Sequence, residues 1–243
     1  MGRLASLAHH PERAAGRRGN PLRSLTIPSE RPASRGTTAA SASRRRRTLP
    51  AGRHARAFVV SSPSGGGKTT VVKQLLRAIP RLARSVSVTT RPRRLGERHG
   101  RDYHFVSPAA FQRLRRSGGL LEWARVHGAC YGTPKRATRQ LLAQGRSVVL
   151  SIDVQGARQV RRALGRQAVL IFLLPPSREA LRQRLIGRRT ETLTAIRRRL
   201  AAAARELACA RWYDHQIVND RLEDAVAHVV QLVRRTLHGT GRD

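Results

Sequence analysis

Lysine is almost missing from this chain, although the chain is strongly basic. Only Lys68, Lys73 and Lys135 are lysines among 243 residues, yet the formal net charge is +35. Acids are scarce as well, with 14 Asp and Glu against 49 Lys and Arg, so arginine carries nearly all of the positive charge. This skew predicts non-specific attraction to polyanions such as nucleic acids, or it reflects a bias in residue usage.

Cysteine and long apolar runs are also scarce. Cys130 and Cys209 are the only cysteines, which is too few for a disulfide framework, and neither has the spacing of metal ligands. No apolar run approaches the roughly 20 residues that a membrane-spanning helix needs. We therefore expect reduced thiols, a cytoplasmic location and no membrane partner. The sequence leaves open whether the protein is a monomer or a homodimer.

Residues 1–56 lack the pattern of a folded segment. Four consecutive arginines occupy positions 44–47, two glutamates are the only acids, and no helical or strand period is sustained. Such a composition buries too little apolar surface to offset the loss of chain entropy, which predicts a disordered arm. Four roles stay open: an organelle transit segment, a nucleic-acid-binding arm, a myristoylated start at Gly2, or a tail without function.

The stretch from residue 61 to 70, Ser-Ser-Pro-Ser-Gly-Gly-Gly-Lys-Thr-Thr, has the pattern of a phosphate-binding loop. It follows an apolar run at 57–60 and precedes helical spacing at 71–79, and strand, glycine-rich turn and helix is the order that such a loop needs. The glycines let backbone N–H groups surround phosphate oxygens, and the helix N-terminus adds a positive dipole. The residues expected at the ATP phosphates are Ser62, Pro63, Ser64, Gly65, Gly66, Gly67, Lys68 and Thr69.

Two side chains of this loop would do the chemistry. Lys68 would reach the β and γ phosphates, and the Thr69 hydroxyl would ligate Mg²⁺. Ser62 stands where the motif usually has its first glycine, and serine has less freedom in φ. A flexible glycine turn is the alternative interpretation, but the Gly-Lys-Thr ending between a strand and a helix argues against it.

Strands and helices alternate from residue 57 to about 237, which predicts an α/β fold with a mainly parallel sheet. The expected core strands are 57–60, 85–90, 148–153, 168–174 and 215–220. The expected helices start near 68, 107, 134, 156, 178, 195 and 222. The run 168–174 is the most apolar and suits a central strand. Short strands between about 90 and 145 predict an inserted small α+β lobe, and ligands of such sheets bind beyond the strand C-termini.

Two acids stand out from their surroundings. Asp153 ends an apolar strand, where an acid would hold Mg²⁺ or its water shell. An ordinary surface acid is the alternative there. Glu122 lies inside the apolar run 120–123, where a carboxylate is out of place. It would accept hydrogen bonds from a base edge that carries N–H donors, which fits guanine.

Two groups of arginines suit phosphate oxygens. Arginine forks at 91–94, with Tyr103 downstream, would hold a second phosphate. Arg184, Arg188 and Arg199 flank the polar segment 187–194, which we interpret as a mobile lid that excludes water and neutralises charge during phosphoryl transfer. The alternative for such arginines is a solvated helix face.

Six stretches in consistent order and spacing resemble the guanylate kinase family, and the resemblance covers about 57–237. They are SVSVTTRP at 85–92, DYHFV at 102–106, LEWA at 121–124, YGTP at 131–134, IDVQGA at 152–157 and IVND at 217–220. The resemblance implies a P-loop kinase fold with a lobe that binds a nucleoside monophosphate. It also implies ATP and GMP as substrates, ADP and GDP as products, and a place in purine nucleotide metabolism with Mg²⁺ as cofactor.

The resemblance also assigns roles to residues. The GMP phosphate would contact Ser87, Arg91, Arg94, Tyr103 and Tyr131. Glu122 and Thr133 would read the guanine, and Asp153 would face GMP as well as the metal. The ATP phosphates and the transferring group would contact Lys68, Arg91, Arg184, Arg188 and Arg199. Asn219 would lie near the adenine or the lid contacts. Positioning and electrostatics would drive an in-line transfer without a covalent intermediate.

The chain departs from the family pattern at two places. Ser151 stands where the family often has an acid that helps to read the guanine amino group, so discrimination against other monophosphates is an open question. The segment 190–194 has fewer acids than usual. Two other functions stay in play: a related P-loop kinase with another phosphorylated acceptor, such as a sugar, and a non-catalytic guanylate-kinase-like binding module. The retained Lys68 and Thr69 argue against the latter.

Overall fold

The computed structural model describes residues 55–126, 128–186 and 193–239, with no side chains described for 193–197. The arm expected at 1–56 therefore lies outside the described residues, except for its last two. These two belong to the folded chain: Ala55 is buried, and the Arg56 N–H donates to Ser147 Oγ at 3.0 Å. The ordered chain thus extends at least two residues before the boundary predicted from composition.

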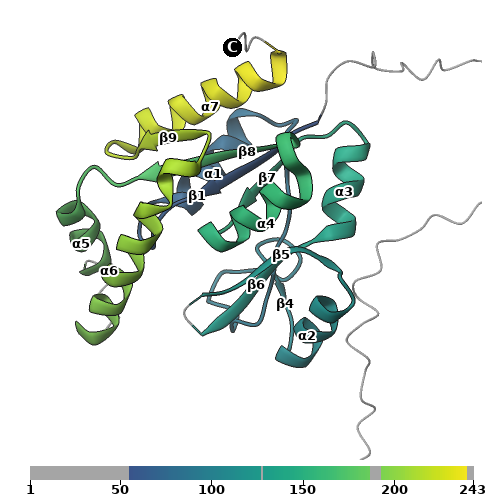
Figure 1. Ribbon diagram of the computed structural model, residues 1–243, viewed down its shortest axis with the longest axis horizontal. Coiled ribbons are helices and arrows are strands. Elements are labelled where there is room, and N and C mark those ends of the chain that lie inside the picture. The colour runs from purple at the N-terminus through teal and green to yellow at the C-terminus, as the bar shows by residue number, and fades with distance from the viewer. Residues whose placement is uncertain (1–54, 127, 187–192, 240–243) are drawn as a thin grey trace, which may run out of the picture. The chain divides into compact units, whose positions relative to one another are not determined.

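A five-stranded parallel sheet forms the larger body (Figure 1), and its strand order is β2-β7-β1-β8-β9. The strands are β1 (Ala57–Ser61), β2 (Ala83–Arg84), β7 (Val148–Ser151), β8 (Ala168–Leu174) and β9 (His215–Val218). Every pairing in this sheet is parallel. The prediction of a mainly parallel α/β sheet is confirmed. The apolar run 168–174 is an interior strand, paired with β1 on one side and with β9 on the other.

Alternation along β1 divides its side chains between two cores. Ala57 and Val59 face the core that contains Val160 of α4 (Val154–Leu164), whereas Phe58 and Val60 face the opposite core. The opposite core also takes side chains from α1 (Lys68–Ala78) and α7 (Leu222–His238). Successive residues of a strand point to opposite faces, so a strand covered by helices on both faces reads as a continuous apolar run. Figure 1 shows α4 on the face toward the viewer.

A second, smaller sheet forms the inserted lobe, and its strand order is β4-β3-β6-β5. Its strands are β3 (Val88–Thr89), β4 (His104–Phe105), β5 (Leu120–Val126) and β6 (Ala129–Pro134). The helices of this region are α2 (Pro108–Arg116) and α3 (Lys135–Ala143). Ser107 caps α2 by accepting the Ala110 N–H at 3.2 Å, as its Ser-Pro start predicted. The predicted α+β insertion is present.

The strand predicted at 85–90 is wrong as a single element, because the segment passes from one sheet to the other. Ser85 N–H donates to Val149 O of the parallel sheet at 3.3 Å, and Thr90 N–H donates to Cys130 O of the lobe at 3.0 Å. Only Val88–Thr89 remains as β3. Its alternating apolar pattern predicts extended backbone correctly, but it does not reveal the change of partner.

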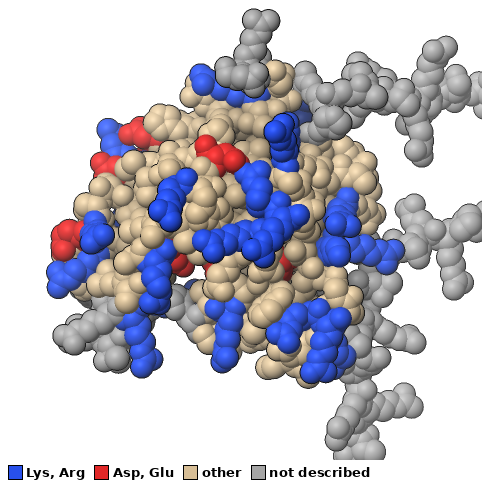
Figure 2. Space-filling model, in the orientation of Figure 1, with Lys and Arg blue, Asp and Glu red and all other residues tan. Residues whose placement is uncertain are grey.

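The remaining helices follow β8. Helix α5 (Arg178–Ile186) has its predicted bounds, whereas α6 (Leu193–Ala208) ends three residues early and is followed by a 3-10 turn, η3 (Ala210–Trp212). Another 3-10 turn, η2 (Gly165–Gln167), follows α4. Helix α4 starts two residues before its predicted start. In the described part of the chain, no helix combines the length and apolarity needed to span a membrane. Figure 2 shows Lys and Arg side chains spread over the visible face, with few acids among them.

Candidate active site

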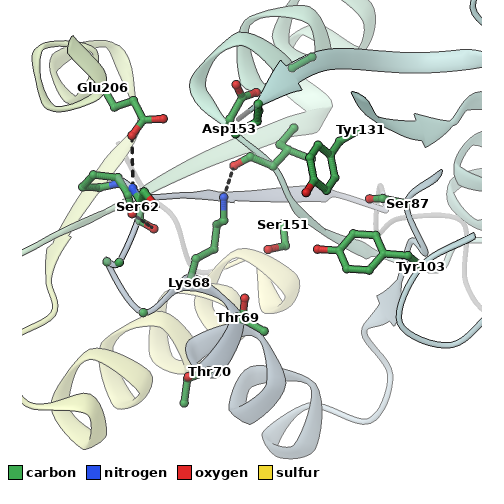
Figure 3. A pocket seen from close by; sticks show the side chains of 18 of the residues that line it. Ser62, Lys68, Thr69, Thr70, Ser87, Tyr103, Tyr131, Ser151, Asp153 and Glu206 are labelled. Carbon is green, nitrogen blue, oxygen red and sulfur yellow. Dashed lines mark hydrogen bonds between the residues drawn. The ribbon is translucent and has the colours of Figure 1, made fainter. Parts of the chain in front are cut away.

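A cavity of about 300 Å³ lies at the carboxyl ends of β1 and β7, where ligands of parallel sheets bind. Side chains of the lobe close its other side, as Figure 3 shows for Ser87, Tyr103 and Tyr131. The residues that line it are 62–70, Ser87, Tyr103, Glu122, Ala124, Val126, Tyr131, Ser151, Ile152, Asp153 and Glu206. The phosphate loop and the suspected base-reading acid thus open into one space.

Glycine is required at two positions of the loop for different reasons. Gly67 has φ of +84°, and a Cβ there would collide with Nδ2 of Asn219. A Cβ on Gly66 would lie only 2.8 Å from Cβ of Ser62. L-residues with side chains rarely adopt such a positive φ, and neither space admits a methyl group. The loop is therefore shaped by its neighbours as well as by its own sequence.

Asn219 follows β9 and fixes this loop from the far end of the chain. Its side chain is buried and donates from Nδ2 to Gly66 O at 2.8 Å. The described residues that line the cavity do not include Asn219, so its contact is with the loop. The expectation that Asn219 lies near the adenine or the lid is not tested by this contact.

Lys68 begins α1, and its ammonium lies deep in the pocket. It donates to Ile152 O at 3.0 Å (Figure 3). Burial lowers the pKa of Lys68 from its ordinary value, and the nearby carboxylates of Asp153, Glu206 and Glu122 oppose that shift in this order. Three acids around one lysine leave this part of the pocket without surplus positive charge. Thr69, in contrast, is exposed at the cavity wall.

Ser62 occupies the position of the missing glycine without disturbing the loop. It is 5 % exposed, and its hydroxyl donates to Pro63 O at 3.1 Å. Its Cβ fills the space beside Gly66, so a residue with a side chain would not fit at position 66. A small side chain is therefore accommodated here because Gly66 leaves room for it.

Glu122 is the buried acid of the site. It is 3 % exposed and pairs across β5 and β6 with Thr133, whose Oγ1 donates to Glu122 Oε1 at 2.6 Å. Gly156 of α4 lies against the carboxylate, and a Cβ there would collide with Oε2. Burial raises the pKa of Glu122 to about 7, although the hydrogen bond from Thr133 acts in the opposite direction. The structure brings together the two residues that the sequence analysis assigned to guanine.

The lobe supplies three hydroxyls to the cavity, from Ser87, Tyr103 and Tyr131. The two tyrosine rings contact each other edge to face, with centroids 6.0 Å apart. Burial raises the pKa of Tyr103, so its hydroxyl stays protonated and available as a donor. These three residues lie together as the resemblance to the family suggested.

Glu97 contacts two predicted arginines of the lobe, the side chain of one and the backbone of the other. Arg91 donates from Nη2 to Glu97 Oε1 at 2.7 Å, and its guanidinium lies over the Tyr103 ring, 5.4 Å from the centroid. The Arg94 N–H donates to Glu97 Oε2 at 2.8 Å, and the residue is exposed. Neither arginine is among the described residues that line the cavity. Glu97 thus occupies the guanidinium of Arg91, whereas it contacts Arg94 only through the backbone.

The arginines assigned to the lid are not gathered at the cavity. Arg184 donates from Nη2 to Asn219 O at 3.0 Å and to Asp220 O at 3.3 Å. Arg199 is half-buried on α6. As far as the structure describes the wall of the cavity, neither is part of it. Arg188 and residues 187–192 of the expected lid lie outside the described residues, and residues 193–194 begin α6.

Glu206 is a pocket residue that sequence reasoning missed. It lies on α6, and its Oε2 accepts the backbone N–H of Ser64 at 3.3 Å (Figure 3). Burial raises its pKa, while nearby Lys68 acts in the opposite direction. One signal was present in the sequence: Glu206 is the only acid in α6, a helix with four arginines.

Thr69 and Asp153 offer oxygen atoms for a metal ion. Asp153 caps α4 by accepting the Gly156 N–H at 2.9 Å and also accepts from Gln155 Nε2 at 3.1 Å. Within the described ranges, no group of three or more His, Cys, Asp or Glu residues converges on one point. Oxygen atoms of this kind are the ligand type that Mg²⁺ prefers.

Comparison with known proteins places these features in one family. A model of the family described as guanylate kinase matches residues 54–236. The guanylate kinase of Oleidesulfovibrio alaskensis is 54 % identical over 168 residues, which are 69 % of this chain and 81 % of that protein. The guanylate kinase of Rubrobacter xylanophilus is 47 % identical over 187 residues, covering 77 % of this chain and 97 % of that protein. A crystal structure of guanylate kinase from Anaplasma phagocytophilum superposes with a TM-score of 0.65 at 34 % identity, over 76 % of this chain and 88 % of that one.

Proposed function

This chain belongs to the guanylate kinase family, and from that premise we propose how its pocket carries out ATP:GMP phosphotransfer. The reaction moves the γ-phosphoryl group of ATP to GMP and gives ADP and GDP. One observation carries the proposal: the phosphate loop and the buried Glu122–Thr133 pair open into the same cavity. A phosphate cradle and a purine-reading acid in one space are what a transfer between two nucleotides needs.

At the ATP end, we propose that the loop from Ser62 to Thr69 holds the phosphates. Backbone N–H groups turned inward by Gly65 and Gly67, both with positive φ, would donate to phosphate oxygens. Lys68 would exchange Ile152 O for a phosphate oxygen and balance charge at the transferring group. Asn219 would act on this end by holding the shape of the loop.

At the GMP end, Glu122 in its carboxylate form would accept hydrogen bonds from the N–H donors on the edge of guanine. Thr133 would keep that carboxylate in place, since it already donates to Oε1. The GMP phosphate would bind to the hydroxyls of the lobe. The residues proposed at this phosphate are Ser87, Arg91, Arg94, Tyr103 and Tyr131. For this, the Arg91 guanidinium would turn from Glu97 to the phosphate, a stronger bidentate partner, and the exposed side chain of Arg94 would reach the same phosphate.

The transfer itself would depend on positioning and charge rather than on a covalent intermediate. The arginines proposed for the transferring group are Arg91, Arg184, Arg188 and Arg199. Arg184 and Arg199 would have to approach the cavity when nucleotides bind, because α5 and α6 carry them at its side. Such closure would exclude water from the phosphoryl group and prevent hydrolysis of ATP.

Mg²⁺ fits the donor set of this site. Thr69 and Asp153 would hold it, through the hydroxyl and through the carboxylate or its water shell. When bound, the ion would neutralise charge on the phosphates. Asp153 would keep its hydrogen bond from the Gly156 N–H, which would hold its carboxylate in one orientation. In that orientation it would hold the ion and face GMP.

A related kinase with another phosphorylated acceptor is the second candidate, and Ser151 is the observation in its favour. It lines the same cavity as Glu122, at a position where the family often has a carboxylate. A serine hydroxyl accepts fewer hydrogen bonds from a guanine amino group than a carboxylate does. We propose that guanine remains the preferred base, because Glu122 and Thr133 are in place.

We further propose that the enzyme works in the cytoplasm, as a monomer or a homodimer, with nucleic acid attracted only non-specifically. Cys130 and Cys209 are both free thiols, which supports a reducing compartment. The spread of arginine over the surface in Figure 2 supports a general attraction to polyanions. The experiment that tests the function is an ADP-release assay with ATP, Mg²⁺ and each of GMP, AMP and ribose 5-phosphate. Turnover with GMP well above the others is expected, and no GDP from GMP would overturn the proposal.

A further inference from the structure

The tip of the phosphate loop is held between two helices that are remote from it in sequence. On one side, α5 presents Leu185 and Leu181, whose methyl carbons would lie 3.1 and 3.5 Å from a Cβ placed on Gly65. On the other side, α6 presents Glu206 to the Ser64 N–H. The two helices pack on each other through Leu181, Leu185 and Ala203. A movement of this helix pair would therefore change the contacts that hold Ser64 and Gly65.

The Glu206 carboxylate makes the kind of contact that a phosphate makes. It accepts a backbone N–H of the loop, and its charge acts on Lys68, the cation that a phosphate would meet. A carboxylate and a phosphate are both oxyanions, and the amides of such a loop are selective for that chemistry. Figure 3 shows Glu206 on the loop side of the pocket, away from the lobe hydroxyls.

A carboxylate at this place has opposite effects before and after nucleotide binds. In the empty loop it supplies the Ser64 amide with an acceptor, and together with Asp153 and Glu122 it balances the charge of the Lys68 ammonium. Beside a triphosphate it would be a like charge at close range in a partly dry site, where repulsion is stronger than in water. Binding of ATP would therefore require that this carboxylate withdraw.

From these contacts we infer that Glu206 is a positioning residue that stands in for a nucleotide phosphate and is displaced by ATP. The inference rests on the proposed function only in taking the loop as the ATP phosphate site. Arg199 lies seven positions before Glu206, about two turns away, and so on the same side of α6. A withdrawal of Glu206 that takes place through movement of α6, rather than through rotation of its side chain, would also move Arg199. The exchange of an anion for a phosphate would thus be linked to the placement of an arginine.

The first test separates the charge of Glu206 from its hydrogen bond. Glu206→Gln keeps an acceptor for Ser64 and removes the charge. Calorimetry with Mg²⁺-ATP or Mg²⁺-triphosphate, without GMP, is expected to show about three- to tenfold tighter binding of both, because no charged group has to be displaced. The affinity for GMP alone is expected to stay the same. Glu179→Gln removes the same charge from exposed Glu179 on α5 and is expected to change neither affinity.

Unchanged or weaker ATP binding in Glu206→Gln would overturn the inference, because it would mean that the carboxylate remains beside the bound phosphates or has no effect on them. Lys68→Ala distinguishes this failure from failure of the proposed function. If Lys68→Ala weakens ATP binding while Glu206→Gln has no effect, only the inference fails. If Lys68→Ala binds ATP as tightly as the unmodified enzyme, the loop is not the phosphate site and both proposals fail.

A second variant tests the positioning of the empty loop. Glu206→Ala removes the acceptor as well as the charge, so hydrogen exchange at the Ser64 amide in the nucleotide-free enzyme is expected to be faster than in Glu206→Gln. Saturating ATP is expected to remove the difference, because phosphate oxygens then satisfy the same amide. Equal exchange in the two variants without nucleotide would show that Glu206 does not position the loop.

Discussion

Asn219 donates a hydrogen bond to the carbonyl of Gly66 at 2.8 Å and thereby joins two segments that are 153 residues apart. The contact is buried, and the same side-chain nitrogen occupies the space next to Gly67. The shape of the phosphate loop therefore depends on the residue that follows the last strand of the sheet. Two variants probe this relationship from its two ends.

Replacing Asn219 with Ala should weaken ATP binding more than GMP binding. The change leaves the Gly66 carbonyl without its buried donor, which costs about 1–3 kcal/mol and corresponds to about a 5- to 150-fold effect. Steady-state kinetics with each substrate varied in turn would measure it, as a rise in KM for ATP. An equal rise in both KM values would show that Asn219 supports the fold in general rather than the loop.

Gly67→Ala should abolish most of the turnover. Alanine at φ of +84° is strained by about 1–2 kcal/mol, and its methyl group would also push Asn219 away. Gly145→Ala is the matched control, since Gly145 has φ of +75° and a methyl group added there would meet no atom within 4 Å. It carries the strain without the collision, so it should lower stability by a similar amount while retaining activity. Comparable activities in the two variants would contradict the role given to this contact.

Lys68→Ala should reduce turnover by at least about a thousandfold and leave the fold intact, because in the proposed mechanism the ammonium balances charge on the transferring group. Circular dichroism and the GDP-forming assay would be measured on the same preparation. Lys73→Ala, which alters an exposed lysine of the same helix, serves as the comparison. Near-normal turnover in Lys68→Ala would remove this lysine from the mechanism.

Arg94→Ala should raise the KM for GMP about 10-fold or more with little change for ATP, because a charge-assisted hydrogen bond to phosphate is worth about 1.5–3 kcal/mol. The exposed Arg98 on the same turn provides the control variant Arg98→Ala. Equal losses for both substrates would exclude Arg94 from the acceptor site. A control variant as impaired as Arg94→Ala would point to the general charge of the turn instead.

Glu122 should make GMP binding depend on pH around neutrality. Its pKa is raised to about 7 by burial, and we propose that the carboxylate form accepts hydrogen bonds from guanine. GMP affinity should therefore increase from pH 6 to pH 8. In Glu122→Gln the increase should shrink to the part that comes from titration of the GMP phosphate, with binding weaker overall. Parallel pH profiles in the two enzymes would contradict this.

The raised pKa of Glu122 also makes the free energy of unfolding depend on pH. The pKa of Glu122 in the folded protein, about 7, lies above its ordinary value of 4.5, so between these two pH values the folded state binds more protons than the unfolded state. The free energy of unfolding should therefore decrease as pH rises from about 4.5 to 7. This decrease should be smaller in Glu122→Gln, measured by urea unfolding at several pH values.

Much of the fold could be predicted from local patterns. The apolar runs predicted β1, β7 and β8, because a strand that is buried on both faces has apolar residues at successive positions instead of an alternation of apolar and polar residues. The order of strand, glycines, lysine and helix identified the phosphate loop because its chemistry is complete within ten consecutive residues. Glu122 was predicted to be unusual because burying a charged side chain among apolar residues is costly unless it has a partner. Each of these signals lies within one short segment.

Contacts between distant segments were decided by the tertiary structure alone. No sequence pattern links Asn219 to Gly66, brings Glu206 to Ser64, or gives Arg91 and the Arg94 backbone to Glu97, because these partners meet only when separate elements pack. The segment 85–90 shows the same limit, since its pattern specifies extended backbone but not which sheet it joins. Local sequence determines backbone conformation and burial through propensity and hydrophobicity, whereas the arrangement of charges around the phosphate loop depends on how α5, α6 and β9 pack against it.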